Sequence, residues 1–122
     1  MRQAAARRAA EAAGRSAETI AILWLSFKGY RLLAQRAKTP VGEIDLIVRR
    51  GRTVAFVEVK ARATPAAALA SIHPAQRRRI ERAARWFLSR RRLEGLDCRF
   101  DVVAISPRHL PRHLANAWTM GE

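Results

Sequence analysis

Two short apolar segments separated by a basic turn constrain the fold of this chain more than any other feature. The first, EIDLIV (43–48), alternates between apolar and other residues, and the second, TVAFVEVK (53–60), is rich in β-branched and aromatic residues. Both patterns predict strands, and the intervening RRGR (49–52) predicts a tight turn. The two strands therefore form a predicted β-hairpin, in which Asp45 would lie opposite Phe56 if it closes symmetrically about residues 50 and 51.

Helices and further strands are expected on either side of this hairpin. A helix is predicted from about residue 16 to a stop at Gly29. The remaining elements are a short strand (30–34), a loop (61–75), a second helix (76–92), a last strand (98–105) and an irregular tail with anchors at Leu114 and Trp118. This order indicates a single α/β domain with a central mixed sheet flanked by helices. We expect residues 1–13 to form a basic N-terminal arm or frayed helix, and residues 14–122 to form the domain.

The first predicted helix carries apolar residues on two sides. One face has the spacing i, i+3, i+4 and i+7 and consists of Ile20, Leu23, Trp24 and Phe27. Ile22 and Leu25 form a second stripe, so we expect the helix to be covered on both sides. Glu18 shares the stripe of Leu25, and a carboxylate at the end of a buried stripe needs a partner, a water molecule or a metal ion.

The charge balance favours an anionic partner. The chain has 122 residues, which suits one domain, and 24 Lys and Arg against 10 Asp and Glu give a formal net charge of +14. Its longest apolar run, Ile20 to Leu25, is far shorter than the roughly 20 residues of a membrane span, so no membrane association is expected. The first residues lack the apolar stretch of a signal peptide, and two glutamates interrupt their similarity to an organellar transit peptide.

Cysteine usage indicates the compartment. Cys98 is the only cysteine, which excludes an intramolecular disulfide and a cysteine-based zinc site. A reducing cytoplasm is the simplest setting for such a chain. We expect Cys98 itself to be a small apolar residue of the core.

Asp45, Glu58 and Lys60 are the candidate catalytic residues. Strand alternation places all three on one sheet face, where helices would cover them and unpaired charges would be costly. A divalent cation between the carboxylates would remove this cost, because Mg²⁺ and Mn²⁺ prefer carboxylate oxygens. Lys60 could then neutralise charge on a phosphate that is being hydrolysed. The alternative is a surface hairpin with an ordinary Glu–Lys pair, but the apolar flanks and the choice of lysine in an arginine-rich chain argue against it.

The same residues carry a resemblance to a known family. GYRLLA (29–34), GEIDLI (42–47) and VAFVEVK (54–60) resemble the YraN-like family of bacterial proteins, and CRFDVV (98–103) resembles its closing strand. The similarity covers about residues 14–118. It implies the restriction-endonuclease-like fold of the PD-(D/E)xK superfamily, which includes archaeal Holliday-junction resolvases.

This resemblance implies a role for individual residues. Asp45 and Glu58 match the metal-binding carboxylates of the superfamily, and Lys60 matches its catalytic lysine. Glu18 matches a helix glutamate that junction resolvases place beside the metal. The implied catalytic set therefore comprises Asp45, Glu58, Lys60 and Glu18, with Mg²⁺ or Mn²⁺ held by the three carboxylates.

The second predicted helix has a basic face suited to nucleic acid. Arg77, Arg78, Arg82, Arg85 and Arg92 cluster opposite the apolar residues Ile80, Ala83, Ala84 and Phe87. Arginine clusters bind phosphates without reading bases. The alternative is a solvated face in an arginine-rich protein.

Several other side chains are expected to be structural. Asp101 is predicted to pair with an arginine rather than to act in catalysis. His109 and His113 are four residues apart, but a proline between them breaks the helix that would align them, which disfavours a zinc site. Core spacing favours packing over base stacking for the aromatic residues Trp24, Trp86 and Phe87.

The predicted function is that of a magnesium-dependent endonuclease or resolvase-like phosphodiesterase acting on DNA. The alternative is a non-catalytic nucleic-acid-binding module, for DNA or structured RNA, that retains the nuclease fold. Residues that bind a metal need not turn over a substrate, so the sequence leaves both open. A symmetric junction would call for a homodimer, although the sequence shows no clear interface stripe.

Overall fold

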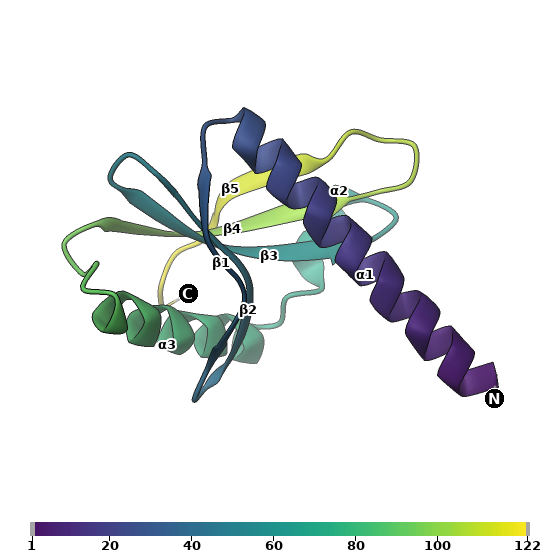
Figure 1. Cartoon of the computed structure of the whole chain (residues 1–122), viewed down its shortest axis with the longest axis horizontal. Coiled ribbons are helices and arrows are strands. Elements are labelled where there is room, and N and C mark those ends of the chain that lie inside the picture. The colour runs from purple at the N-terminus through teal and green to yellow at the C-terminus, as the bar shows by residue number, and fades with distance from the viewer. Residues whose placement is uncertain (1, 122) are drawn as a thin grey trace.

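The computed structural model describes residues 2–121 as one five-stranded mixed sheet with helices on both faces (Figure 1). In chain order the elements are α1 (Arg2–Phe27), β1 (Arg31–Thr39), β2 (Gly42–Arg50), β3 (Thr53–Ala61), α2 (Pro65–Ala70), α3 (Pro74–Arg90), β4 (Asp97–Ile105) and β5 (Arg112–Trp118). The strand order in the sheet is β1-β2-β3-β4-β5. The predicted α/β fold with a mixed sheet is therefore confirmed.

The connections explain why the sheet is mixed. Tight turns join β1 to β2 and β2 to β3, so these neighbours are antiparallel. The chain then crosses over through α2 and α3 before β4 pairs parallel to β3, as a parallel pair requires. Finally β5 pairs antiparallel to β4 and forms the edge of the sheet on that side. The structure thus places β3, which carries Glu58, at the centre of the sheet.

Each face of the sheet has its own apolar core. On one face α3 contributes Ile80, Ala83, Ala84 and Phe87, the four residues predicted for its apolar side. They pack with Phe56 and Phe100 from the sheet. On the other face Ala21 and Leu25 of α1 pack with strand residues such as Leu46 and Val57. Helices consequently cover both faces of β2 and β3, where Glu58 is buried and Asp45 and Lys60 are half-buried.

Helix α1 differs from its prediction. It is buried through Ala17, Ala21 and Leu25, whereas Leu23 and Phe27 are exposed, Phe27 at 89%. The prediction that the helix is covered on two sides is therefore wrong within residues 2–121, because only the side that carries Ala17, Ala21 and Leu25 packs on the sheet. The helix also passes without a break through the expected boundary at residues 13 and 14, and its N-terminal half projects beyond the sheet (Figure 1).

Two segments predicted to be irregular contain regular structure. The 61–75 loop includes α2, which begins after Thr64, whose hydroxyl accepts a hydrogen bond from Ala67 N at 3.1 Å, and α3 starts at Pro74. The expected irregular tail forms β5, which ends at Trp118. Trp118 is buried, so its predicted role as an anchor is confirmed.

Two expected core residues lie at the surface. Cys98 is exposed, because β4 enters the core only at Phe100, two residues further on. Trp86 is 37% exposed and lies beside the α3 face that packs on the sheet. Within residues 2–121, none of the helices combines the length and the apolar character needed to cross a bilayer.

Candidate metal centre and nucleic-acid interface

The candidate site lies where β2 and β3 separate. Their pairing runs from Arg50↔Thr53 to Leu46↔Val57. Beyond this point β2 continues to pair with β1 on its other side. Asp45 and Glu58 are the next residues of the two strands. Side chains from both strands can therefore occupy the fork that opens between them.

The register corrects the predicted hairpin. Ile47, not Asp45, lies opposite Phe56, because the two-residue turn consists of Gly51 and Arg52. The shift is two positions, and a shift of two does not by itself move a side chain to the other face of the sheet. The simple alternation expected for 43–48 also fails, since Ile44 packs in the same cluster as Ile47.

Asp45 and Glu58 hold the fork together through reciprocal hydrogen bonds. Val59 N donates to Asp45 Oδ2 at 2.9 Å, and Asp45 N donates to Glu58 Oε2 at 3.3 Å. Glu58 is 4% exposed. The two carboxylates therefore accept hydrogen bonds from backbone N–H groups of this fork, where direct pairing of the two strands has stopped.

The environment of this pair disfavours two negative charges. Burial raises the pKa of Glu58 to about 8, and the charge of Asp45 adds to the effect. Burial likewise raises the pKa of Asp45, with smaller contributions from the charges of Glu18 and Glu43, against a lowering by the Val59 hydrogen bond and Lys60. Near neutral pH the pair therefore retains a proton unless a cation replaces it.

Lys60 and Gln76 flank the carboxylates. Lys60 lies two residues after Glu58 on β3, is half-buried, and its charge lowers the pKa of both acids. Gln76, in the first turn of α3, has its Nε2 3.4 Å from Glu58 Oε1. Sequence reasoning assigned no role to Gln76, because its proximity to Glu58 follows only from the packing of α3 on the sheet.

Glu18 has partners of its own. Arg36 Nε donates to Glu18 Oε1 at 3.0 Å and Gln35 Nε2 donates to the same oxygen at 3.1 Å, both from β1. These contacts provide the partner that the sequence demanded for this carboxylate. Across residues 2–121 there is no group of three or more His, Cys, Asp or Glu side chains arranged to hold a metal ion. The structure thus brings Asp45 and Glu58 together, while the metal-ligand role of Glu18 stays a prediction.

Asp101 occupies the neighbouring strand in a very different environment. Arg99 donates to it from Nε at 2.9 Å and from Nη2 at 2.8 Å, which confirms the predicted pairing with an arginine. His113 Nε2 lies 2.7 Å from Asp101 Oδ2, and Asn116 N donates to Oδ1 at 3.0 Å. Burial alone would raise the pKa of Asp101, but the hydrogen bonds from His113 and Arg99 lower it below its usual value.

The two histidines are engaged separately. His113 Nδ1 lies 2.6 Å from Lys28 Nζ, so both of its ring nitrogens have partners. His109 Nδ1 lies 2.7 Å from Pro107 O in the loop before β5. These contacts account for both histidines without the zinc site that the sequence disfavoured.

The arginine face of α3 is exposed to solvent over most of its length. Arg78, Arg82 and Arg85 are exposed, whereas Arg77 is half-buried with its guanidinium carbon 5.5 Å from the centroid of the Trp118 ring. Arg92 lies beyond the last helical residue, Arg90, so it does not extend the helical face as expected. Glu81, the one acidic residue among these arginines, is buried and accepts a hydrogen bond from Gly121 N. The exposed face is therefore almost purely basic.

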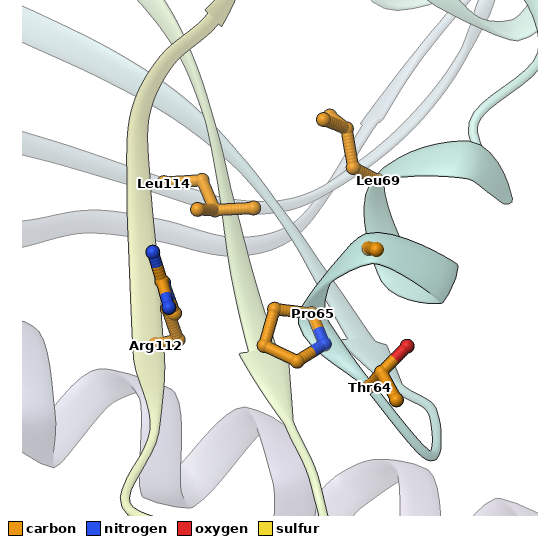
Figure 2. Close-up of a pocket in the computed structure, with 6 residues that line it drawn as sticks. Thr64, Pro65, Leu69, Arg112 and Leu114 are labelled. Carbon is orange, nitrogen blue, oxygen red and sulfur yellow. The ribbon is translucent and has the colours of Figure 1, made fainter.

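A separate pocket lies between α2 and β5. Figure 2 shows Pro65 and Leu69 of α2 facing Arg112 and Leu114 of β5 across it. Its volume is about 400 Å³. Its lining is mostly apolar and contains no carboxylate, so this pocket has no chemistry in common with the Asp45–Glu58 fork.

Fold and site together define a mixed α/β protein with a buried and a half-buried carboxylate at a strand fork. The chain belongs to the uncharacterised protein family UPF0102, whose model matches residues 17–105. A UPF0102 protein of Parvibaculum lavamentivorans is 58% identical over 86% of this chain and 80% of its own length. One of Maricaulis maris is 54% identical over 96% of this chain and 93% of its own. The family membership implied by the YraN-like resemblance is thereby confirmed.

Proposed function

We propose that this protein is a metal-dependent phosphodiesterase of the restriction-endonuclease-like type that cleaves DNA in the cytoplasm. The observation that carries the proposal is the Asp45–Glu58 pair, a half-buried and a buried carboxylate at a strand fork, neither of which is hydrogen-bonded to a basic side chain of residues 2–121. Folding places such groups together at a cost unless another charge compensates them. A divalent cation would supply that charge.

The donor set fits Mg²⁺ or Mn²⁺. Asp45 and Glu58 would hold the ion through hard carboxylate oxygens, and Mg²⁺ commonly uses one or two carboxylates, with waters and substrate phosphate completing its coordination. When bound, the ion would acidify water and stabilise charge on the phosphate. The raised pKa of Glu58 means that its proton leaves as the ion binds.

Lys60 has a distinct role in this proposal. Its ammonium group stands two residues from Glu58 on the same strand and on the same face of the sheet, and lysine can donate up to three hydrogen bonds. We assign it to the phosphate oxygen that gains charge during hydrolysis, where a fixed positive charge lowers the barrier. It serves the reaction, whereas the two carboxylates serve the ion.

The exposed arginines of α3 supply the proposed nucleic-acid contact. Helix α3 begins at the candidate site, since Gln76 in its first turn reaches Glu58. Arg78, Arg82 and Arg85 therefore line a path that leads away from the carboxylates, and guanidinium groups suit the phosphates of a duplex. Replacing these three arginines by Ala should flatten the salt dependence of DNA affinity by about 0.9 per lost contact on a log–log scale.

A matched variant controls for bulk charge. Arg7, Arg8 and Arg15 are exposed on the N-terminal half of α1, away from the sheet, and their replacement by Ala removes the same charge. Fluorescence anisotropy with a labelled duplex between 50 and 300 mM salt measures both slopes. Equal slopes in the two triple variants would refute the α3 face as the specific contact surface.

The metal site is tested by thermal unfolding with and without Mn²⁺. At about a hundredfold excess over the dissociation constant, binding should stabilise the protein by about 2.7 kcal/mol. Asp45→Asn should abolish this shift. Lys60→Ala should keep the shift and lose cleavage of a panel of duplex, flap, junction and single-stranded DNAs. A wild-type protein that shows no shift in millimolar Mn²⁺ rules out the proposed metal site.

The second candidate function is a non-catalytic nucleic-acid-binding module. One observation favours it: in residues 2–121 the acidic residues form no cluster of three, and Glu18 is already bonded to Arg36. This candidate expects DNA or structured RNA to bind through α3 without cleavage and without a metal-induced shift. The Mn²⁺ measurement therefore separates the two functions. A homodimer, detected by analytical ultracentrifugation, would favour a two-fold symmetric substrate.

A further inference from the structure

Three arginines line a small pocket at the opposite end of β2 from Asp45. The pocket has a volume of about 370 Å³ and is lined by Gly29, Arg31, Arg49, Arg50 and Gly51. Its lining contains no carboxylate. The ion pairs found in residues 2–121 involve Arg36, Arg99 and His113, none of which lines the pocket. The positive charge of the pocket is therefore not neutralised within the described chain.

The strand register makes this arrangement costly without a ligand. Arg31 of β1 and Arg49 of β2 are direct cross-strand partners. Like charges directly opposite each other destabilise a sheet, whereas most other arginines of the chain lie on helices or in loops where they can separate. An anion between Arg31 and Arg49 would convert this repulsion into attraction.

Two of the three arginine side chains are held in place by contacts within the protein. Arg50 Nη1 donates to Lys28 O at 3.1 Å, and its guanidinium carbon lies 4.4 Å from the centroid of the buried Tyr30 ring. Arg49 Nε donates to Gly51 O at 2.9 Å. Each of these guanidinium groups is thus held by a contact within the protein and still has N–H groups beyond the one used, which leaves donors for an anion.

The end of α1 does not oppose an anion here. A helix C-terminus carries partial negative charge on its free carbonyl groups. In this protein Leu25 O accepts hydrogen bonds from Lys28 N and Tyr30 N, and Ser26 O accepts one from Gly29 N. Lys28 O is occupied by Arg50. The carbonyls nearest the pocket are therefore satisfied, and the arginines dominate its field.

We propose that this pocket, formed by Arg31, Arg49 and Arg50, binds a phosphate group. The source is either a phosphodiester of a nucleic-acid backbone or free phosphate, because both present the same oxygens to guanidinium groups. Assignment to DNA rests on the proposed function: Arg49 lies four residues from Asp45 along β2, about 13 Å, a distance that one bound duplex covers. Phosphate binding itself does not depend on metal binding or cleavage.

The double variant Arg31→Gln/Arg49→Gln tests the pocket, and Arg52→Gln is its matched control. Arg52 lies in the same turn and is exposed but does not line the pocket. In anisotropy measurements with a labelled duplex, the double variant should bind more weakly and lose about 0.9 from the log–log salt slope, the value for one phosphate contact. Arg52→Gln should keep the wild-type slope. Because Arg31 and Arg49 repel each other, the double variant should melt no lower than wild type without ligand.

A titration of ¹⁵N-labelled wild-type protein with inorganic phosphate identifies the source of the anion. A saturable shift of the Arg49 Nε–H signal, with chloride at equal ionic strength causing none, supports a free-phosphate site even where the DNA slope is unchanged. A reduced DNA slope in the double variant alone supports backbone phosphate. If neither effect is seen, the pocket does not bind phosphate. If Arg52→Gln loses as much slope as the double variant, the DNA contact is not specific to the pocket, and the assignment to backbone phosphate fails. Neither result depends on the Mn²⁺ shift, so this inference and the metal site fail independently.

Discussion

Two buried carboxylate sites on neighbouring strands have opposite electrostatic environments. Asp101 on β4 is fully buried and receives hydrogen bonds from Arg99, His113 and the Asn116 N–H. Glu58 on β3 and Asp45 on β2 each accept a hydrogen bond from a backbone N–H, and Glu58 accepts one from the Gln76 amide. Within residues 2–121 neither is hydrogen-bonded to a basic side chain. The pKa of Asp101 is lowered, whereas burial raises those of Asp45 and Glu58. The chain thus completes one acidic site itself and leaves the other uncompensated.

This difference separates a structural carboxylate from a candidate catalytic one. Within the chain, Asp101 already has a cation, Arg99, held at 2.8 Å. Glu58 has the burial of a structural site, but within residues 2–121 neither Glu58 nor the half-buried Asp45 is hydrogen-bonded to the basic partner that makes such burial tolerable. An external cation is the simplest missing component. The functional proposal therefore requires that Asp101 and the Asp45–Glu58 pair respond differently to substitution, to pH and to metal ions.

The largest expected effect is on global stability. Asp101→Asn leaves Arg99 and His113 without their anion and should lower the free energy of unfolding by about 3–5 kcal/mol, the usual range for breaking a buried pair. The matched change Glu58→Gln replaces a carboxyl that is protonated near neutral pH and should be close to neutral or stabilising. Urea denaturation in EDTA measures both. Equal destabilisation would make the Asp45–Glu58 pair structural as well.

The next effect is a pH dependence of opposite sign at the two sites. The folded protein binds the Glu58 proton more tightly than the unfolded chain, since the pKa rises from 4.5 to about 8. Stability of the metal-free protein should therefore fall as pH rises between these values, by an amount on the order of a few kcal/mol. The lowered pKa of Asp101 works the other way, and its contribution is lost on acidification.

The variant Glu58→Gln isolates the contribution of Glu58 to this profile. It should remove the Glu58 share of the decline between pH 4.5 and about 8 and leave the acid limb, to which Asp101 contributes, in place. Urea midpoints in EDTA from below pH 3.8, where the Asp101 contribution is lost, up to pH 8.5 give the profile, and saturating Mg²⁺ should also flatten the decline at higher pH in wild type. A wild-type stability that is constant across this range would show that burial does not raise the pKa values of Asp45 and Glu58.

Local patterns predicted much of the fold and part of the site. Strand alternation placed Asp45 and Glu58 on one face, and this held although the register was wrong by two positions, because side chains repeat every second residue. The apolar face of α3 was also predicted correctly, as helical periodicity requires only the order of residues. Both successes depend on spacing along the chain alone.

The remaining features depend on contacts that spacing does not encode. Strand β5 was missed because Pro111 directly precedes it and Asn116, with a positive φ angle, interrupts it, so that pairing with β4 is what stabilises it. The exposed side of α1 was missed because alanines rather than Leu23 and Phe27 face the sheet. Likewise, the sequence predicted an arginine partner for Asp101 but not His113, which joins from β5.

The smallest expected effect concerns Glu18, which has an arginine partner as Asp101 does but also acts on Asp45 through its charge. It raises the pKa of Asp45 through its charge, yet it is paired with Arg36 at 3.0 Å in a contact whose arginine is 39% exposed. Glu18→Gln should change stability by about 0–1 kcal/mol, as for other partly solvated pairs.

Glu43 is a matched control, because it is exposed and also raises the pKa of Asp45 through its charge. If Glu18 acts only through its field, Glu18→Gln and Glu43→Gln should weaken Mn²⁺ binding to a similar small extent, measured by thermal shift across a Mn²⁺ titration. A loss in Glu18→Gln as large as that in Asp45→Asn would instead make Glu18 a direct ligand, as its position in the YraN-like pattern implies, and would require it to leave Arg36 when the ion binds.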